Sequence, residues 1–264
     1  MNTLPTDSLA LEQKIWRYMD LNKFVLLLTR QALYFPCLTE LDDPYEGYMP
    51  KSHAKAMAEV LEKTYFGPHR ALRPHFEAQS EAQAVILDEI AEQVRQKISY
   101  REMRRNFAVN CWHANDKESE AMWKIYSAFG SGIAIESTVE RLRDVLLPYS
   151  GVNINRVQYE DFDTAQIEKG RTAYFLLSKR PSFEYEHEVR ATCKLDTPDK
   201  GIELKCDLTK LIVRVYVSPS ASPVFLQSIQ ELCSGLVHGL RLEVVPSQVF
   251  AEPTYDLNRG LDTD

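Results

Sequence analysis

Several features that would assign a class at once are missing from this chain of 264 residues. Its five cysteines, Cys37, Cys111, Cys193, Cys206 and Cys233, are scattered and odd in number. They predict neither a disulfide framework nor the paired spacing of a structural zinc site. Glycine numbers only 10, and none of these residues forms the strand-to-helix loop that cradles phosphate. A Walker motif, a nucleophile elbow and a zinc-protease helix are also absent.

Long hydrophobic runs are missing as well. The longest apolar stretch, residues 24–28, ends at Thr29 and Arg30 and is far too short to cross a bilayer. The first residues have neither a basic start nor an apolar stretch, so no secretory signal is visible. A formal charge of -7 argues against a protein that coats nucleic acid through bulk electrostatics. We therefore expect a cytoplasmic protein without a membrane partner.

Strand and helix patterns alternate irregularly, which favours an α+β fold over a doubly wound sheet. We expect a core of short strands in a mixed sheet, forming a single domain over residues 1–250. Residues 51–105 read as a helical insertion or cap, and residues 251–264 as a loose C-terminal tail. The expected strands are 14–19, 33–35, 107–112, 133–136, 152–159, 183–190, 211–217 and 242–245, and the expected helices outside the insertion are 20–31, 118–129, 138–147, 167–178 and 222–236.

The most informative segment is Phe-Glu-Tyr-Glu-His-Glu-Val-Arg at residues 183–190. Side chains alternate between the two faces of a strand, so Glu184, Glu186, Glu188 and Arg190 would line one face. Like charges in one row repel, and the row needs either water or a cationic partner. The segment predicts either a solvated strand face or a ridge of carboxylates at the edge of an active site.

Aromatic residues near the middle of the chain allow two readings. Trp123 and Tyr126 share a helix face, where they form either part of the core or a platform for a flat ring. His113 follows a strand, where side chains commonly emerge into a cleft. Cys111 lies two residues before it, but nothing in the sequence lowers the pKa of its thiol, so we do not assign it as a nucleophile.

The order of the motifs resembles an uncharacterised bacterial family, domain of unknown function family 2971, over roughly residues 12–250. This resemblance implies no established activity. It is carried by the segments Trp16-Arg-Tyr-Met19, Leu33-Tyr-Phe35, Asp43-Pro-Tyr-Glu46, Cys111-Trp-His113, Met122-Trp-Lys-Ile-Tyr126, Gly132-Ile-Ala-Ile135 and Tyr185-Glu-His-Glu-Val-Arg190.

The chain is also similar, more faintly, to mono-ADP-ribosyltransferases of the arginine–serine–glutamate kind. That similarity implies an arginine on the NAD phosphates, a Ser-Thr strand beside nicotinamide, and a glutamate that stabilises the positive charge developing on ribose. Val139 stands where the family has its second serine, and the long gap before Ser137 requires the insertion. The implied catalytic residues are Glu188 and its partner Glu186, and the implied cofactor-binding residues are Arg17, Tyr34, Trp123, Tyr126, Ser137 and Arg190.

This similarity implies an NAD-consuming enzyme, either an ADP-ribosyltransferase or an NAD glycohydrolase, acting as a toxin or phage-defence effector. NAD would be its nucleotide substrate, and a protein or nucleic acid its acceptor. We expect Glu188→Gln to abolish NAD turnover at a nearly unchanged melting temperature.

Two alternatives stay open. A divalent-metal nuclease or phosphohydrolase would use Asp43, Glu46, His113, Glu186 and Glu188 as ligands. A sensor or interaction module without catalysis would instead use Lys179, Arg180 and Arg190 merely to pair with the glutamates.

Overall fold

The computed structural model describes residues 9–48, 104–126, 130–165 and 174–251. The chain forms two compact units, each built from separated segments. The first unit comprises Met1–Tyr34, Cys111–Ser150 and Glu203–Asp264, and the second comprises Phe35–Asn110 and Gly151–Ile202. The expected insertion therefore falls almost wholly outside the described residues, as does nearly all of the expected tail.

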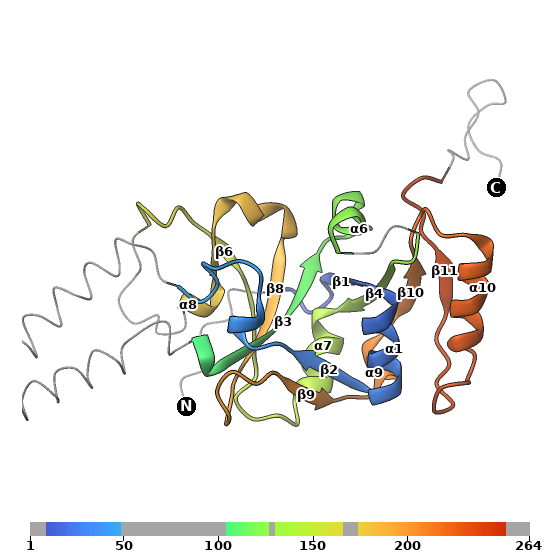
Figure 1. The fold of residues 1–264 in the computed structure, drawn as a ribbon, viewed down its shortest axis with the longest axis horizontal. Coiled ribbons are helices and arrows are strands. Elements are labelled where there is room, and N and C mark those ends of the chain that lie inside the picture. The colour runs from blue at the N-terminus through green and yellow to red at the C-terminus, as the bar shows by residue number, and fades with distance from the viewer. Residues whose placement is uncertain (1–8, 49–103, 127–129, 166–173, 252–264) are drawn as a thin grey trace, which may run out of the picture. The chain divides into compact units, whose positions relative to one another are not determined.

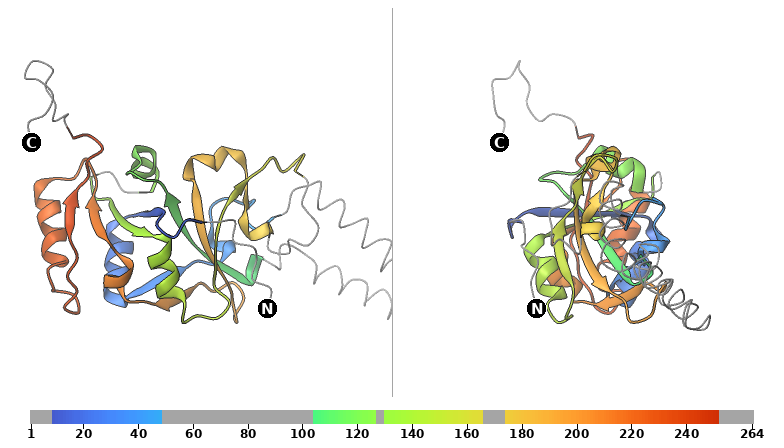
Figure 2. Two further views of the ribbon diagram at one scale, coloured as in Figure 1. Left: turned by 180° about the vertical axis from the view of Figure 1, so that it is seen from behind. Right: turned by 90° about the vertical axis from the view of Figure 1, so that its left-hand side faces the viewer.

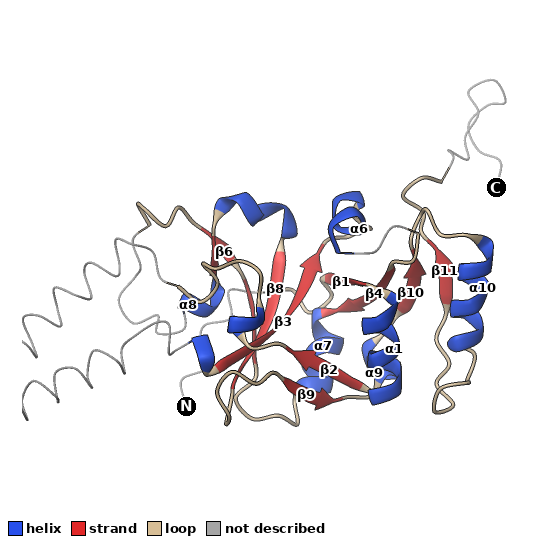
Figure 3. Ribbon diagram, viewed as in Figure 1, coloured by secondary structure: helices blue, strands red, loops and turns tan. Residues whose placement is uncertain are grey.

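The main sheet has seven strands in the order β11-β10-β4-β1-β3-β8-β5. The neighbours β10 and β11 are parallel, whereas β1 with β3, β1 with β4, β10 with β4 and β5 with β8 are antiparallel. The mixed sheet with its helices confirms the α+β class (Figure 3). The strands are β1 Lys14–Met19, β3 Phe107–Ala114, β4 Ile133–Thr138, β5 Asn153–Arg156, β8 Glu188–Lys194, β10 Arg214–Val217 and β11 Val244–Pro246.

Of the helices in the described ranges, most belong to the first unit (Figure 1). Its N-caps follow the sequence pattern, because Asp20, Thr138 and Ser222 each accept a backbone N–H from the residue three positions later. Figures 1 and 2 show α10 running beside β11, with which it packs. The helices are α1 Leu21–Arg30, α6 Glu120–Tyr126, α7 Val139–Leu146, α9 Leu208–Leu211 and α10 Pro223–Leu232.

One face of β1 and its neighbours in the first unit carries an aromatic cluster. Trp16, Tyr18, Trp123 and Tyr216 are buried there with Met122. The Tyr18 ring meets the Trp123 ring edge-on at 5.0 Å, and Trp16 meets Tyr216 in the same way at 5.0 Å. Edge-to-face contacts of this kind stabilise a core beyond the burial of apolar area alone.

The second unit is built from short elements around β8 and β5. A 3-10 helix spans Pro181–Glu186, and Leu38–Glu40 forms another. The remaining elements are α8 Tyr174–Leu177, β6 Gln158–Tyr159 and β7 Ser178–Lys179, with β6 and β7 paired in parallel. The strands β2 Ala32–Phe35 and β9 Ile202–Lys205 form a separate pair, mostly within the first unit.

Several predicted element boundaries are wrong. The expected strand 152–159 is interrupted at Val157, and Ser178 lies in β7 instead of in the helix 167–178. The strand expected over 211–217 starts only at Arg214, because Asp207 caps the short helix α9 by accepting the Thr209 N–H. Strand β9 was not predicted.

Candidate functional site

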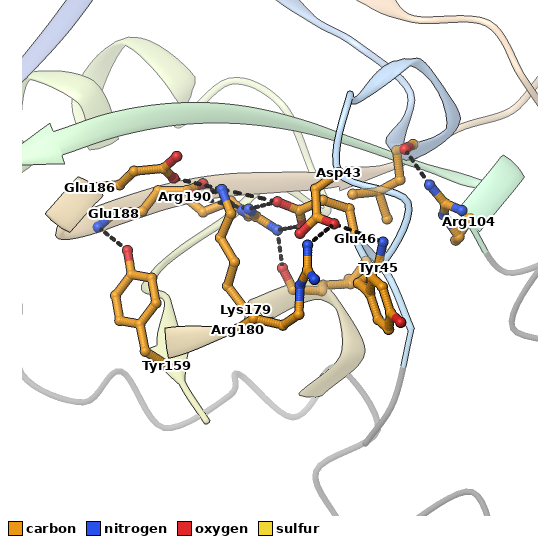
Figure 4. Close-up of polar contacts among 12 residues, drawn as sticks. Asp43, Tyr45, Glu46, Arg104, Tyr159, Lys179, Arg180, Glu186, Glu188 and Arg190 are labelled. Atoms are coloured by element: carbon orange, nitrogen blue, oxygen red, sulfur yellow. Dashed lines mark hydrogen bonds and ion pairs between the residues drawn. The ribbon is translucent and has the colours of Figure 1, made fainter. Parts of the chain in front are cut away.

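The second unit encloses a network of ion pairs centred on Lys179 (Figure 4). The Lys179 Nζ atom lies 2.5 Å from Glu186 Oε2, 3.1 Å from Glu46 Oε1 and 3.4 Å from Glu188 Oε2. An ammonium group has three N–H donors, so each can point at a different carboxylate. Lys179 therefore joins three acidic side chains from three separate elements of the chain.

Arg190 is the second cation of this network, and all five of its N–H donors have acceptors. Its Nε donates to Glu188 Oε1 at 2.6 Å, and its Nη2 donates to Glu188 Oε2 and Glu46 Oε1 at 2.9 and 3.0 Å. Its Nη1 donates to Glu46 Oε2 and to the Leu176 carbonyl, both at 2.9 Å. The guanidinium thus grips two carboxylates in the paired geometry that suits its planar fork.

The network is buried, but not uniformly. The Arg190 side chain is 0% exposed, and those of Glu46 and Glu188 are 2% and 3% exposed. Exposure rises to 6% at Glu186 and 9% at Lys179. The pair of Glu186 and Lys179 is consequently the edge of the network closest to solvent.

Among the described residues, the network joins three carboxylates to two cations. Burial lowers the pKa of Lys179, but the carboxylates of Glu188 and Glu46 raise it by more, so it stands above its ordinary value of 10.5. Lys179 is therefore protonated at neutral pH.

The expected strand over 183–190 is wrong in its first half, and so is the solvated row of glutamates. Pro181 opens the 3-10 helix, which is typical of proline in a first turn. The helix ends at His187, which adopts a left-handed conformation with φ 40°, and β8 begins at Glu188. Glu186 and Glu188 still reach the same ammonium, because the turn at His187 directs both of them to Lys179.

Neighbouring backbone groups hold the network in place. The Glu188 N–H donates to the Tyr159 hydroxyl at 2.8 Å. Burial raises the pKa of Tyr159, and the Glu188 carboxylate raises it further. Glu46 lies in a tight turn that ends at Gly47, with φ 75°. A Cβ atom at Gly47 would lie 2.7 Å from Arg104 Cγ, so the turn requires glycine for space as well as for conformation.

Arg180 lies next to the network but is held differently. Its Nη2 donates to Asp43 Oδ1 at 2.8 Å, while Asp43 also accepts the Tyr45 N–H. The guanidinium carbon lies 4.2 Å from the centroid of the Tyr45 ring and 5.4 Å from that of the Phe183 ring. The Phe183 ring is also 4.8 Å from Lys179 Nζ. This ring therefore contacts both Arg180 and the edge of the network.

The structure brings six of the predicted site residues together in the second unit. Lys179 and Arg190 pair with the glutamates, as the non-catalytic alternative expected, whereas Arg180 pairs with Asp43. Sequence reasoning did not identify Tyr45, Tyr159 or Phe183 as contributors. In the sequence, only the Asp-Pro-Tyr-Glu run at residues 43–46 pointed to the loop that contains Tyr45. The six residues are Asp43, Glu46, Lys179, Glu186, Glu188 and Arg190.

Two predicted residues of the first unit lie on strands. Arg17 is half-buried, and burial lowers its pKa. Ser137 is fully buried, and its hydroxyl donates to the Leu211 carbonyl at 2.7 Å. Their convergence with Glu188 on one NAD pocket stays a prediction.

The aromatic and histidine candidates of the first unit divide into buried and exposed residues. Trp123 is buried in the aromatic cluster, and its Nε1 donates to Glu118 Oε2 at 3.0 Å. His113 is buried too, whereas Tyr34 and Tyr126 are exposed. The core reading of Trp123 therefore fits its position, while Tyr126 on the same helix reaches solvent.

The five cysteines are free thiols, and burial raises the pKa of Cys193, Cys206 and Cys233 to about 11. Within the described ranges, no cluster of three or more His, Cys, Asp or Glu side chains is arranged to hold a metal ion. Every helix of the described segments is too short or too polar to cross a bilayer.

No protein-family model, curated protein or solved structure matches the chain. The resemblances drawn from the sequence therefore stay predictions.

Proposed function

We propose that the protein is an NAD-consuming enzyme whose reacting centre lies at the solvent-side edge of the Lys179 network. The observation that carries this proposal is a buried cluster of three carboxylates held in place by hydrogen bonds, of which Glu186 lies closest to solvent. Fixed negative charge in a site of low dielectric stabilises a positive charge that develops during reaction. Cleavage of the bond between nicotinamide and ribose develops such a charge on the ribose carbon.

The reaction requires no added redox partner. The bond between the ribose C1′ carbon and the nicotinamide nitrogen breaks, and its electron pair leaves with nicotinamide, which becomes neutral. The carbon, now electron-poor, forms a bond to an oxygen of water or of an acceptor, and that oxygen releases its proton. A carboxylate beside C1′ lowers the energy of the positively charged stage between these two events.

Glu186 is the carboxylate best suited to this role. Both oxygens of Glu188 are held by Arg190, and one of them also lies near Lys179. Glu186 lies at the more exposed edge of the network, so a substrate reaches it more readily than Glu188. We therefore assign Glu186 as the reacting carboxylate and Glu188, Arg190 and Glu46 as positioning residues, which exchanges the roles expected for the two glutamates.

Nicotinamide release from NAD by the purified protein tests this proposal. Glu186→Gln should lower turnover by about 100-fold or more, because the amide keeps the shape and loses the charge. Glu184→Gln is the matched control, since Glu184 is exposed and belongs to the same short helix. It should retain wild-type turnover.

Two results would contradict the assignment of Glu186. Wild-type protein that releases no nicotinamide at millimolar NAD, or a Glu186→Gln variant with undiminished turnover, would rule out this centre. The melting temperature of each variant shows whether a loss of activity follows from unfolding. Glu188→Gln should lower both activity and melting temperature, because it leaves part of Arg190 without its partner.

A further inference from the structure

Arg180 uses fewer of its N–H donors than Arg190, all five of whose donors have acceptors. Only Nη2 of Arg180 has an acceptor among the described residues, namely Asp43 Oδ1. Its side chain is 35% exposed, whereas that of Arg190 is 0% exposed. A guanidinium carries five N–H donors. Arg180 Nε is buried without an acceptor, so the partly exposed side chain keeps unused donors at a fixed position.

The position of Arg180 is fixed by stacking as well as by its ion pair. The Tyr45 ring lies 4.2 Å from the guanidinium carbon, and the Phe183 ring lies 5.4 Å from it. A planar guanidinium held against aromatic rings loses little further freedom when it binds an anion. A preorganised arginine of this kind suits phosphate, which it contacts through two parallel N–H groups.

The charge around Arg180 limits what it can bind. Asp43 balances the charge of Arg180, and the neighbouring network places three carboxylates close by. A free anion gains little from long-range attraction here, so binding depends on the directed donors of Arg180. A ligand that joins a phosphate to a ribose would give Arg180 an anionic partner and would offer ribose hydroxyls as donors to the carboxylates.

We propose that Arg180, stacked on Tyr45, is the phosphate-recognition residue of the site, and that the ligand class is a ribosyl phosphate or pyrophosphate. This inference rests on the proposed function for the identity of the sugar. It assigns phosphate recognition to the unit that contains Glu186, in place of Arg17 in the other unit. The Phe183 ring, which contacts both Arg180 and Lys179, joins the phosphate end of the site to its carboxylate end.

Titration calorimetry with ADP-ribose tests the inference without any need for turnover. ADP-ribose carries a pyrophosphate and a ribose and lacks the bond to be cleaved. Arg180→Gln should weaken its binding about tenfold or more, because a charge-assisted pair of hydrogen bonds is lost. Arg180→Lys should restore only part of the affinity, since an ammonium cannot replace the fork. Arg143→Gln removes one exposed arginine from α7 and is the charge-matched control.

Four results separate this inference from the proposed function. Binding of ADP-ribose that is lost in Arg180→Gln and kept in Arg143→Gln supports phosphate recognition, even when NAD is not cleaved. Equal affinity in wild type and Arg180→Gln overturns it, as does a wild-type protein that binds no ADP-ribose. NAD cleavage with an unchanged KM in Arg180→Gln also overturns it, while the assignment of Glu186 stands.

Discussion

The two units are stabilised by opposite means. The buried aromatic cluster of the first unit consists of packed rings whose polar atoms bond to neighbouring groups, such as Trp123 Nε1 to Glu118. The buried centre of the second unit consists of five charged groups that satisfy one another. Apolar burial stabilises a fold whatever the ionisation state of its side chains. A buried ion pair offsets the cost of desolvating its charges only while both partners stay charged. The second unit should therefore be the more sensitive to charge-altering substitutions.

The largest effect is expected for Arg190→Met. This change removes the guanidinium that holds buried Glu46 and Glu188 and leaves them to share Lys179 with Glu186, which should cost about 3–5 kcal/mol of unfolding free energy. Arg190→Lys should recover little, because three donors replace five. Urea unfolding followed by circular dichroism measures both variants. A loss below about 1 kcal/mol for Arg190→Met would show that the network contributes little to stability.

Alkaline pH should weaken the same network. The folded-state pKa of Lys179 lies above its ordinary value of 10.5. The ammonium therefore contributes its full stabilisation below pH 10.5, and this contribution is lost as pH rises toward the folded-state value. We expect the difference in unfolding free energy between wild type and Lys179→Met to shrink between pH 9 and pH 11.5. A difference that stays constant over this range would contradict the pairing of Lys179 with its carboxylates.

A substitution in the aromatic cluster of the first unit should have a smaller effect than Arg190→Met in the second. Trp123→Phe keeps an aromatic ring beside Tyr18 and removes the Nε1 donor to Glu118. The expected loss is about 1–2 kcal/mol, because a hydrogen bond to a charged acceptor is removed and the side chain becomes smaller. Thermal unfolding provides the measurement. A loss as large as that of Arg190→Met would remove the distinction between the two units.

The smallest effect is expected at His187, the left-handed residue between Glu186 and Glu188. His187→Gly should stabilise the protein by about 0.5 kcal/mol, since glycine adopts this conformation without strain but loses more entropy on folding. His187→Val should destabilise it by about 1 kcal/mol or more. Chemical unfolding of the two variants distinguishes these signs. Equal stability of the His187→Gly and His187→Val variants would show that the turn at residue 187 does not require a left-handed conformation.

The local pattern of the sequence predicted most of the first unit. Strand β1 and helix α1 were expected at nearly their observed bounds, because the Asp20 cap and the apolar spacing act over a few residues. The same reasoning failed at 183–190. Alternation there indicated one strand, but the proline at 181 and the contacts of Glu186 with Lys179 outweighed it.

The sequence by itself therefore determined the α+β class, the helix starts at Asp20 and Ser222, and the presence of a glutamate-rich segment with arginine two residues beyond. It also placed Glu46, Lys179, Glu186, Glu188 and Arg190 on a list of candidates without relating them to one another. Only the tertiary structure decided that these residues from distant segments share one buried network, and that Arg180 keeps unused donors while Arg190 has none. The physical reason is that caps and periodicity depend on neighbours in the chain, whereas ion pairing depends on which segments the fold brings within about 3–4 Å of each other.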